Sequence, residues 1–425
     1  MADSSAKNLL KNLEKSGIAD DGDLRNSLKV LSEKSSGEKV GSKQLVAHLI
    51  ETGLITQWHA DKLLAGKYKG FFLDKYKLLG HLGSGGMSSV YLAESKSTSQ
   101  KRAIKVLPKS KVSDKSYLDR FYREGRAAAK LNHPNIVRVY DINNSGDTHY
   151  LVMEYVQGSD LYQTVRNHGA LSIEEAVDAI IQCSEGLSHA HEKELVHRDI
   201  KPANLLRTDS GLVKILDLGL ALFSVEGEES LTVLHNEKVM GTADYLSPEQ
   251  AINSHNIDHR ADIYSLGCTL YYLLTARPPF NKGTLAQRIA LHQTKEPDSI
   301  LESRPDCPAK LIDICNKMIQ KKPEDRFANC REVIIALKQF QESGDMSPPV
   351  SGSEAPVEAI VEPVSEFAID SDSGPGSIKF QQAIQKAPPI KRRKRKSTPI
   401  WLIPSLIAFM IISLIAVLFL VTQFI

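Results

Sequence analysis

The sequence predicts an α+β domain with a short helical segment before it and a linker and a transmembrane helix after it. Strand-like runs at 76–82 and 90–94 open the α+β part, and a capping box at Ser172 and Glu175 begins one of its later helices. The last 26 residues carry no charged side chain. The chain therefore divides into four predicted segments: 1–72 (helical), 73–340 (α+β), 341–399 (linker with a basic run) and 400–425 (transmembrane helix).

Composition excludes several classes of protein. Apolar residues make up 42% of the 425 residues, which is enough for a sizeable core. Removing the six basic residues at 391–396 from the 53 lysines and arginines leaves 47 against 51 acidic residues, so the rest is slightly acidic. We therefore expect no nucleic-acid partner. The five cysteines form no C-x-x-C pair, which argues against a zinc site or a disulfide framework and favours a reducing compartment.

The first 72 residues show helical periodicity. Apolar residues share one face of a helix expected over 42–52, which stops at Gly53, and a second short helix is expected over about 56–65, which stops at Gly66. The N-terminus lacks the continuous apolar core of a secretory signal. Docking onto the following domain, dimerisation and passive packing all stay open as roles for this segment.

The C-terminal part combines a linker, a basic run and an apolar segment. Residues 341–390 are rich in Pro, Ser, Gly and acidic residues, which is typical of an extended, disordered linker. The uncharged segment would extend about 39 Å as a helix, against roughly 30 Å for the hydrocarbon core of a bilayer. Trp401 suits the membrane interface, and Pro404 falls near the first turn, where proline costs least.

The basic run KRRKRK at 391–396 predicts how the apolar segment 400–425 is oriented across the membrane. Such a run beside a membrane span marks the cytoplasmic flank and binds anionic lipid. The alternatives are a nuclear address or nucleic-acid patch for the run, and a buried core helix for the apolar segment. We expect a single-pass membrane protein whose α+β domain is cytoplasmic and whose C-terminus lies on the far side.

A glycine-rich run lies between the two predicted strands. It reads LGSGGMSSV over 82–90, and a small serine, Ser88, stands where a third glycine is common. A dinucleotide fingerprint would lead from a strand into a helix, whereas this run leads from strand to strand. Backbone N–H groups in such a loop can fold over phosphates because Gly83 and Gly85 permit close approach. A plain hairpin is the alternative if nothing else agrees.

Two further charged residues are expected to face inward. Lys105 lies in the short apolar strand RAIKVL, and a buried lysine is costly unless it is paired with a charge. Glu124 shares a helix face with Phe121 and Ala128 in a segment capped by Ser113 or Asp114. An inward glutamate beside an inward lysine can hold the lysine against phosphates.

The strongest motif is HRDIKPANLL over 197–206, followed by Asp217 in ILDLGL. Asp199 can accept or orient a hydroxyl proton, and Lys201 can neutralise a migrating phosphoryl group. Asn204 and Asp217 offer hard oxygen ligands suited to Mg²⁺. Phosphoryl transfer needs positioning and charge stabilisation more than covalent help, and these residue types supply both.

Together these motifs resemble those of eukaryotic-type serine/threonine protein kinase domains, and closely those of the bacterial membrane-bound members. The resemblance covers residues 73–340 and implies two lobes, a β-rich N-lobe and an α-rich C-lobe. It also implies ATP and Mg²⁺, or Mn²⁺ in its place, and protein substrates. The residues that carry it lie in GSGGMSSVY (83–91), RAIK (102–105), HRDIKPAN (197–204), DLG (217–219), SPE (247–249), DHRADIYSLG (258–267) and PEDRF (323–327).

The resemblance assigns roles to individual residues. It makes Asp199 the catalytic aspartate with Lys201 beside it, pairs Lys105 with Glu124, and gives Mg²⁺ to Asn204 and Asp217. It pairs Glu249 with Arg326, and Asp262 braces the catalytic loop from a central helix. The implied ATP-binding residues are Leu82, Gly83, Ser84, Gly85, Gly86, Val90, Lys105 and, at the hinge between the lobes, Glu154 and Val156.

Departures from the family pattern are mild. Ser88, Leu218 and Ser247 replace a glycine, a phenylalanine and an alanine, and none of these changes removes a charge, a metal ligand or the catalytic aspartate. Lys201 and Thr242 are what serine/threonine kinases show near the acceptor. The alternatives to an active protein kinase are a pseudokinase scaffold and a small-molecule kinase, and the long loop ending in GTADYLSPE argues for a protein acceptor.

Regulation by phosphate on the loop between Asp217 and Glu249 is a further hypothesis. Arg198 directly precedes the catalytic aspartate, as in kinases whose loop is activated by phosphorylation. Phosphate on Ser230 or Thr232, added by autophosphorylation, would dock against Arg198 and order the loop. The alternative is an arginine that is hydrogen-bonded to nearby carbonyls.

Overall fold

The structure is a computed structural model that describes residues 4–35, 40–85, 88–217, 243–252 and 257–344. The predicted linker was placed too early by its first residues, because 341–343 continue helix α15. The rest of the linker from residue 345, the basic run and the predicted transmembrane helix lie outside these ranges, as do Gly86, Leu218, Ser230, Thr232 and Thr242. Within the described ranges, no helix combines the length and the apolar character needed to cross a membrane.

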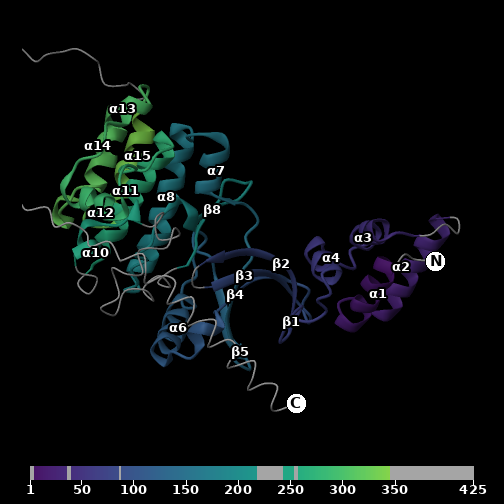
Figure 1. Cartoon of the computed structure of the whole chain (residues 1–425). Coiled ribbons are helices and arrows are strands. Elements are labelled where there is room, and N and C mark those ends of the chain that lie inside the picture. The colour runs from purple at the N-terminus through teal and green to yellow at the C-terminus, as the bar shows by residue number, and fades with distance from the viewer. Residues whose placement is uncertain (1–3, 36–39, 86–87, 218–242, 253–256, 345–425) are drawn as a thin grey trace, which may run out of the picture. The chain divides into compact units, whose positions relative to one another are not determined.

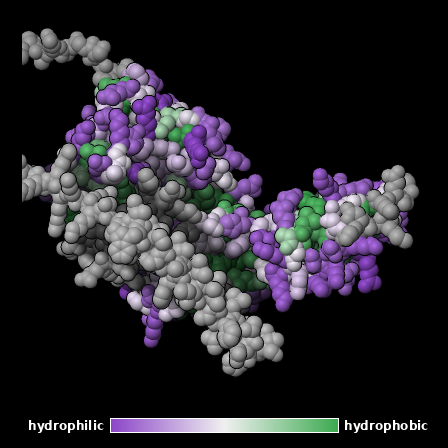
Figure 2. All heavy atoms as spheres, viewed as in Figure 1, coloured by the Kyte–Doolittle hydropathy of each residue, from purple (hydrophilic) through white to green (hydrophobic). Residues whose placement is uncertain are grey.

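Four helices form the N-terminal segment. Buried leucines of α1, α3 and α4, such as Leu9, Leu45 and Leu63, share one core that also includes Phe71. Hydrophilic residues dominate the visible surface of these helices, apart from a small apolar patch near α3 and α4 (Figure 2). The two helices predicted here are confirmed as α3 and α4. The bounds are α1 (Ser4–Ser16), α2 (Asp21–Lys34), α3 (Ser42–Glu51) and α4 (Gln57–Leu64).

His59 at the start of α4 is fully buried, and both of its ring nitrogens are hydrogen-bonded. Its Nδ1 accepts from the backbone N–H of Thr56 at 3.1 Å, so its Nε2 carries the hydrogen and donates to the carbonyl of Leu78 at 2.6 Å. Burial, helped by the charge of Lys77, outweighs the hydrogen bond to Leu78 and lowers the pKa of His59 from 6.5 to about 4. The ring is therefore neutral at pH 7.

This histidine predicts an acid sensitivity of the fold. Because the unfolded state takes up a proton near pH 6.5 and the folded state only near pH 4, stability from His59 is present above pH 6.5 and is lost as the pH falls towards 4. The loss amounts to about 3 kcal/mol of unfolding free energy. Urea unfolding at pH 7, 5.5 and 4.5 measures it, and His59→Gln should remove this part of the pH dependence. An unchanged pH profile in the variant would contradict the assignment.

The N-lobe contains a six-stranded antiparallel sheet with strand order β1-β2-β3-β4-β6-β5 (Figure 1). Strands β2 and β3 form the predicted strand–loop–strand unit, which is confirmed, and β2 is bulged between Leu78 and Gly80 and again between His81 and Gly83. The bounds are β1 (Phe72–Leu73), β2 (Tyr76–Gly85), β3 (Ser88–Ser95), β4 (Lys101–Val106), β5 (Val139–Ser145) and β6 (Thr148–Glu154).

Helix α6 (Lys115–Ala128) packs on this sheet, preceded by the short α5 (Lys109–Val112). Asp114 caps α6 by accepting from the N–H of Tyr117. Phe121 is buried on its inner face. A Cβ at Gly125 would come within 2.8 Å of Ile142 and 2.9 Å of Leu151, so glycine allows the helix to lie close to β5 and β6.

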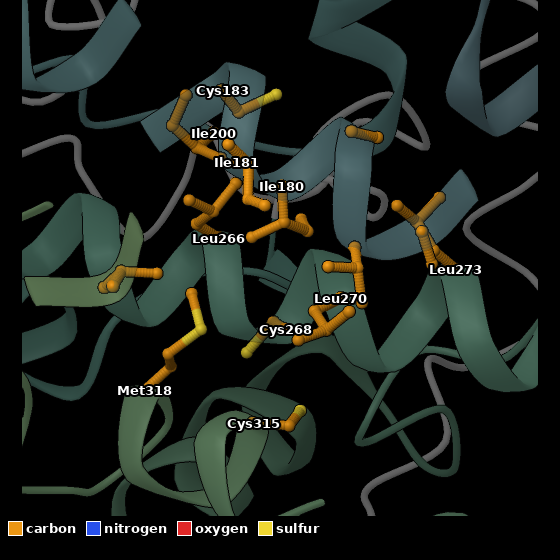
Figure 3. Close-up of a cluster of buried hydrophobic side chains, with 14 of the residues drawn as sticks. Ile180, Ile181, Cys183, Ile200, Leu266, Cys268, Leu270, Leu273, Cys315 and Met318 are labelled. Atoms are coloured by element: carbon orange, nitrogen blue, oxygen red, sulfur yellow. The ribbon is translucent and has the colours of Figure 1, made fainter. Parts of the chain in front are cut away.

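The C-lobe is mainly helical around α8 and α11. The predicted capping box, Ser172 with Glu175, opens α8. Ile180 and Ile181 of α8 lie with Leu266 and Leu270 of α11 in one buried cluster (Figure 3). The helices are α7 (Leu161–His168), α8 (Ile173–His191), α10 (Pro248–Ile252), α11 (Arg260–Thr275), α12 (Leu285–Thr294), α13 (Ile300–Ser303), α14 (Ala309–Met318) and α15 (Cys330–Ser343).

A small three-stranded sheet connects α7 and α8 to the catalytic motif. Its strand order is β7-β8-β9, and a single 3₁₀ turn, η1 (Pro202–Asn204), leads directly into β8. The strands are β7 (Ser159–Asp160), β8 (Leu205–Arg207) and β9 (Val213–Ile215), and a second 3₁₀ turn, η4 (Pro323–Asp325), precedes α15. The predicted two-lobed α+β architecture is thereby confirmed. All five cysteines are free and buried.

Candidate active site

The motif over 197–204 forms a tight polar loop between α8 and β8. Lys201 Nζ donates to both carboxylate oxygens of Asp199, at 2.9 and 2.8 Å. The amide nitrogen of Asn204 donates to Asp199 Oδ2 at 2.9 Å and to the Asp199 carbonyl at 2.8 Å. The carboxylate of Asp199 is thus fixed by two neighbours that are two and five positions away in the chain.

Asp262, fully buried in α11, holds this loop from below. Its two oxygens accept from the backbone N–H groups of His197 at 2.8 Å and Arg198 at 2.7 Å, and Oδ2 also accepts from His191 Nε2 at 2.8 Å. Burial alone would raise the pKa of Asp262, but the hydrogen bonds and charges of His191 and His197 outweigh it, and the pKa is lowered. The carboxylate is therefore ionised and fixes the backbone on both sides of the loop's first peptide bond.

His197 is a site residue that the sequence reasoning missed. Its side chain is buried, its Nδ1 accepts from the N–H of Asp199 at 3.1 Å, and its Nε2 donates to the carbonyl of Leu216 at 2.7 Å. The N–H of Leu216 in turn donates to the carbonyl of Asn204 at 2.8 Å. His197 thereby ties the loop of Asp199 to the residue that precedes Asp217. Only its place in the HRD triplet could have drawn attention to it.

Lys105 corrects one prediction. Within the described residues its ion pair is with Asp217, at 2.7 Å from Nζ to Oδ1, and not with Glu124 on α6 as predicted. Burial raises the pKa of Asp217, but Lys105 first, and then His197 and Lys201, outweigh it, and the pKa is lowered. The Asp217 carboxylate is therefore ionised, and it forms an ion pair with the ammonium group of Lys105 on β4.

Two residues of the site have backbone conformations that L-amino acids rarely adopt. Arg198 has φ of 65° and Asp217 has φ of 56°. Such conformations cost about 1–3 kcal/mol each. The conformation of Arg198 is held because its N–H donates to Asp262 and its carbonyl accepts from Gln250 Nε2 at 2.9 Å. Of the two residues with strained backbones, Arg198 directly precedes Asp199, and Asp217 is itself a candidate Mg²⁺ ligand.

The donor set of Asn204 and Asp217 fits a hard divalent cation. Asn204 uses its amide nitrogen for both hydrogen bonds to Asp199, which leaves its amide oxygen for another ligand. The described residues contain no cluster of three or more His, Cys, Asp or Glu side chains that could enclose a metal. Mg²⁺ accepts such sparse protein ligation because it keeps waters and takes oxygens from substrate phosphates.

An apolar face lies in the N-lobe beside these polar groups. Val90 on β3, Val156 after β6 and Leu216 before Asp217 are partly buried and pack on a cluster that includes Ala103 and Met153. These side chains come from four separate stretches of the chain. They can form the flat apolar surface that an adenine ring needs.

Glu154 at the predicted hinge is held by several contacts. Its backbone N–H donates to the carbonyl of Arg138 at 2.8 Å. Its side chain accepts from Lys214 Nζ at 3.1 Å and from the Arg138 N–H at 3.2 Å. The pairing with Lys214 was not predicted. Since the N–H of Glu154 is already used, any backbone contact of Glu154 with a ligand must come from its carbonyl.

The glycine-rich loop continues β2 and β3 as a hairpin. Gly83 pairs with Val90 and Gly85 with Ser88, while Leu82 is exposed. The hydroxyl of Ser84 lies 2.8 Å from His81 Nε2. A Cβ at Gly83 would meet nothing within 4 Å, so the protein's own packing does not require glycine there. Close approach of a ligand would explain that glycine.

Glu249 and Arg326 form a buried ion pair below the site. Arg326 donates to the two carboxylate oxygens at 2.7 and 2.8 Å, and its side chain is fully buried. It also donates to the carbonyls of Gln320, Lys321 and Arg260. The pair connects α10 to the segment between η4 and α15, although the two residues are far apart in sequence.

The fold has two lobes. One lobe contains the glycine-rich hairpin of β2 and β3, and the other contains the loop of Asp199, Lys201 and Asn204, which Asp262 holds in place. This combination defines a phosphotransferase of the protein kinase class. The model of the protein kinase domain family matches residues 76–336, more than half of the chain. The chain belongs to this family.

Named relatives and solved structures agree. The chain is 38% identical to the serine/threonine-protein kinase PrkC of Bacillus subtilis over 265 residues, which cover 62% of this chain and 40% of that protein. It is 37% identical to PknB of Mycobacterium tuberculosis over 264 residues, covering 61% and 42%. The chain thus spans about two fifths of the length of these curated relatives. The crystal structure of the Mycobacterium tuberculosis PknI kinase domain matches with a TM-score of 0.51 at 27% identity, covering 64% of this chain and 98% of that one.

Proposed function

We propose that the chain is an ATP-dependent serine/threonine protein kinase that transfers the γ-phosphate of ATP to hydroxyl groups of proteins. The observation that carries the proposal is the carboxylate of Asp199, held by Lys201 and Asn204 on a loop braced by Asp262. A pseudokinase scaffold would be expected to have lost one of these groups or Lys105 or Asp217. Their retention, and the kinase relatives, favour catalysis over the scaffold.

The proposed chemistry assigns one task to each polar group. Asp199 orients the acceptor hydroxyl and takes its proton as the oxygen bonds to the γ-phosphorus and the bond to the ADP oxygen breaks. Lys201, already on Asp199, offsets the negative charge that develops there. Asn204 and Asp217 would hold Mg²⁺, which supplies further charge neutralisation at the phosphates. Lys105 binds the α- and β-phosphates once it exchanges Asp217 for them.

The rest of the site suits the nucleotide and the acceptor. The backbone of the glycine hairpin covers the phosphates, and the face formed by Val90, Val156 and Leu216 receives adenine. Lys201 and Thr242 support serine or threonine as the acceptor, and a protein acceptor is favoured over a small molecule by the length of the segment that precedes Glu249.

Labelled ATP tests the activity directly. The full chain, incubated with Mg²⁺ or Mn²⁺ and a generic basic protein, is expected to label serine and threonine. Lys105→Met should abolish most transfer, because it removes the ammonium group that meets the phosphates. Tight binding of ATP by the wild type without any transfer would instead support the scaffold.

Arg198 supports the proposed regulation by phosphate on Ser230 or Thr232. Its backbone is fixed by Asp262 and Gln250, yet its Nε is buried and finds no hydrogen-bond partner among the residues that the structure describes. The alternative, a guanidinium saturated by carbonyls, does not fit this atom. Mass spectrometry of active protein should find phosphate on the segment 218–242, and Arg198→Ala should cancel the activation that autophosphorylation gives. Active protein without phosphate there would refute it.

The membrane location is proposed from composition alone. The uncharged segment 400–425 would span the bilayer once, and the basic run at 391–396 would bind anionic lipid on the cytoplasmic side. Full-length chain should sediment with membranes, and a chain ending at residue 390 should stay in the supernatant. Equal sedimentation of both would refute the anchor.

A further inference from the structure

Helix α4 makes its contacts with the N-lobe at a bulge of β2. Between Leu78, which pairs with Ala93, and Gly80, which pairs with Leu92, the register shifts, so Leu79 is the extra residue. A bulge leaves a backbone group without its partner in the ladder. Here Thr56 Oγ1 donates to the carbonyl of Leu79 at 2.6 Å.

Two neighbouring side chains of α4 extend this attachment. His59 Nε2 donates to the carbonyl of Leu78 at 2.6 Å. The ring of Trp58 meets the ring of Tyr91 on β3 edge-on, with centroids 6.2 Å apart. Tyr91 is adjacent to Val90, which belongs to the apolar face of the site. Residues 56–59 therefore contact both strands of the hairpin that forms the glycine-rich loop.

The geometry of these residues is itself fixed by a capping box. The Thr56 N–H donates to His59 Nδ1 at 3.1 Å, and the His59 N–H donates to Thr56 Oγ1 at 3.3 Å. The first bond sets the tautomer that lets Nε2 donate to Leu78, and the second leaves the hydroxyl hydrogen free for Leu79. The start of α4 is thus preorganised to donate hydrogen bonds to two successive carbonyls of β2, those of Leu78 and Leu79.

Thr56 and His59, which make these contacts with β2, lie outside the part of the chain that matches the kinase family. The family match begins at Tyr76, so α4 is an addition to the kinase domain of this chain. From Leu79, β2 continues to Gly85 at the loop itself, with its second register shift between His81 and Gly83. Contacts that hold the bulge at Leu79 therefore also hold the strand that leads into the glycine-rich loop, which is the root of that loop.

We propose that Thr56, Trp58 and His59 are positioning residues for nucleotide binding, which act by holding the bulged root of the glycine-rich loop. The proposal rests on the ATP site described above. A loop with a fixed root loses less conformational freedom when it closes over phosphates, so the N-terminal helices favour ATP binding without touching ATP. This contact also selects docking onto the N-lobe among the roles left open for the N-terminal segment.

A second buried histidine in the same helices supplies a matched control. His48 Nε2 contacts the carbonyl and the hydroxyl of Ser27, at 2.9 and 3.0 Å, so its hydrogen bonds stay within the N-terminal helices. His48 is 5% exposed, and His59 is fully buried. Loss of either side chain weakens the helical segment, but only loss of His59 releases β2.

The experiment uses the full chain with His59→Ala, Thr56→Val, Thr56→Ser and His48→Ala. We expect KM for ATP to rise roughly tenfold in His59→Ala and severalfold in Thr56→Val, with kcat changed less than about threefold. Thr56→Ser keeps the hydroxyl and should behave as wild type. Hydrogen exchange over residues 76–85 should accelerate in the first two variants only.

Two outcomes overturn the proposal. One is a similar rise of KM in His48→Ala and His59→Ala, which would make the effect one of general destabilisation. The other is unchanged KM and unchanged exchange over 76–85 in His59→Ala. If the wild type transfers no phosphate, the proposed activity fails, but the dissociation constant for ATP from calorimetry and the exchange data still decide whether α4 positions the loop.

Discussion

Replacement of Asp199 by asparagine is expected to lower kcat by about 10²–10⁴-fold, because the amide cannot take the proton of the acceptor hydroxyl. This corresponds to about 3–5 kcal/mol of transition-state stabilisation. KM for ATP should change little, since Asp199 contacts Lys201 and Asn204 rather than the apolar face or the glycine hairpin. Steady-state kinetics with a peptide acceptor and varied ATP measure both quantities.

Asp209→Asn is the control for this substitution. Asp209 is exposed in the turn between β8 and β9, close in sequence to Asp199 but outside the polar loop. Its kinetics should equal those of the wild type. If Asp199→Asn keeps kcat within tenfold of the wild type, another group takes the proton and the assignment of Asp199 is wrong.

The largest loss of stability is expected for Arg326→Met. Without the guanidinium, the Glu249 carboxylate loses two charged hydrogen bonds, and the carbonyls of Gln320, Lys321 and Arg260 lose their donors. Breaking such a buried pair from one side costs about 3–5 kcal/mol. The thermal midpoint should fall by roughly 10 °C. Urea unfolding and calorimetry measure the two quantities.

The chain offers a second Arg–Glu pair for comparison. Arg331 and Glu192 are paired at the surface, with side chains 71% and 49% exposed. Arg331→Met should change stability by less than about 1 kcal/mol. The double substitution Arg326→Met with Glu249→Leu should recover part of the loss, because it no longer leaves a carboxylate unpaired. Equal effects of Arg326→Met and Arg331→Met would contradict the energetic role of burial.

Much of the site could be predicted because its chemistry is local. Asp199, Lys201 and Asn204 lie within one loop, so their order and spacing in the sequence already bring their polar groups together. The glycine hairpin could be predicted for the same reason, since β2 and β3 are consecutive strands. The capping box of α8 and the helices α3 and α4 follow from short-range patterns that do not depend on the rest of the fold.

Contacts between distant segments were harder to predict. Lys105 was expected to pair with Glu124, but Asp217 lies within reach of its ammonium group and Glu124 is not its ion-pair partner. The link from His197 to Leu216 and the pair of Lys214 with Glu154 were missed, because nothing in the local sequence shows which carbonyl or carboxylate a side chain will meet.

By itself the sequence determined the family, the two-lobed α+β class and the set of groups able to transfer a phosphoryl group, since residue type and short spacing encode these. Only the tertiary structure decided which carboxylate neutralises Lys105 and which backbone groups Asp262 fixes. It alone showed that Thr56 and His59 meet the bulge of β2. The physical reason is that hydrogen bonds and ion pairs act over about 3 Å, and only the folded chain brings residues from separate segments to that distance.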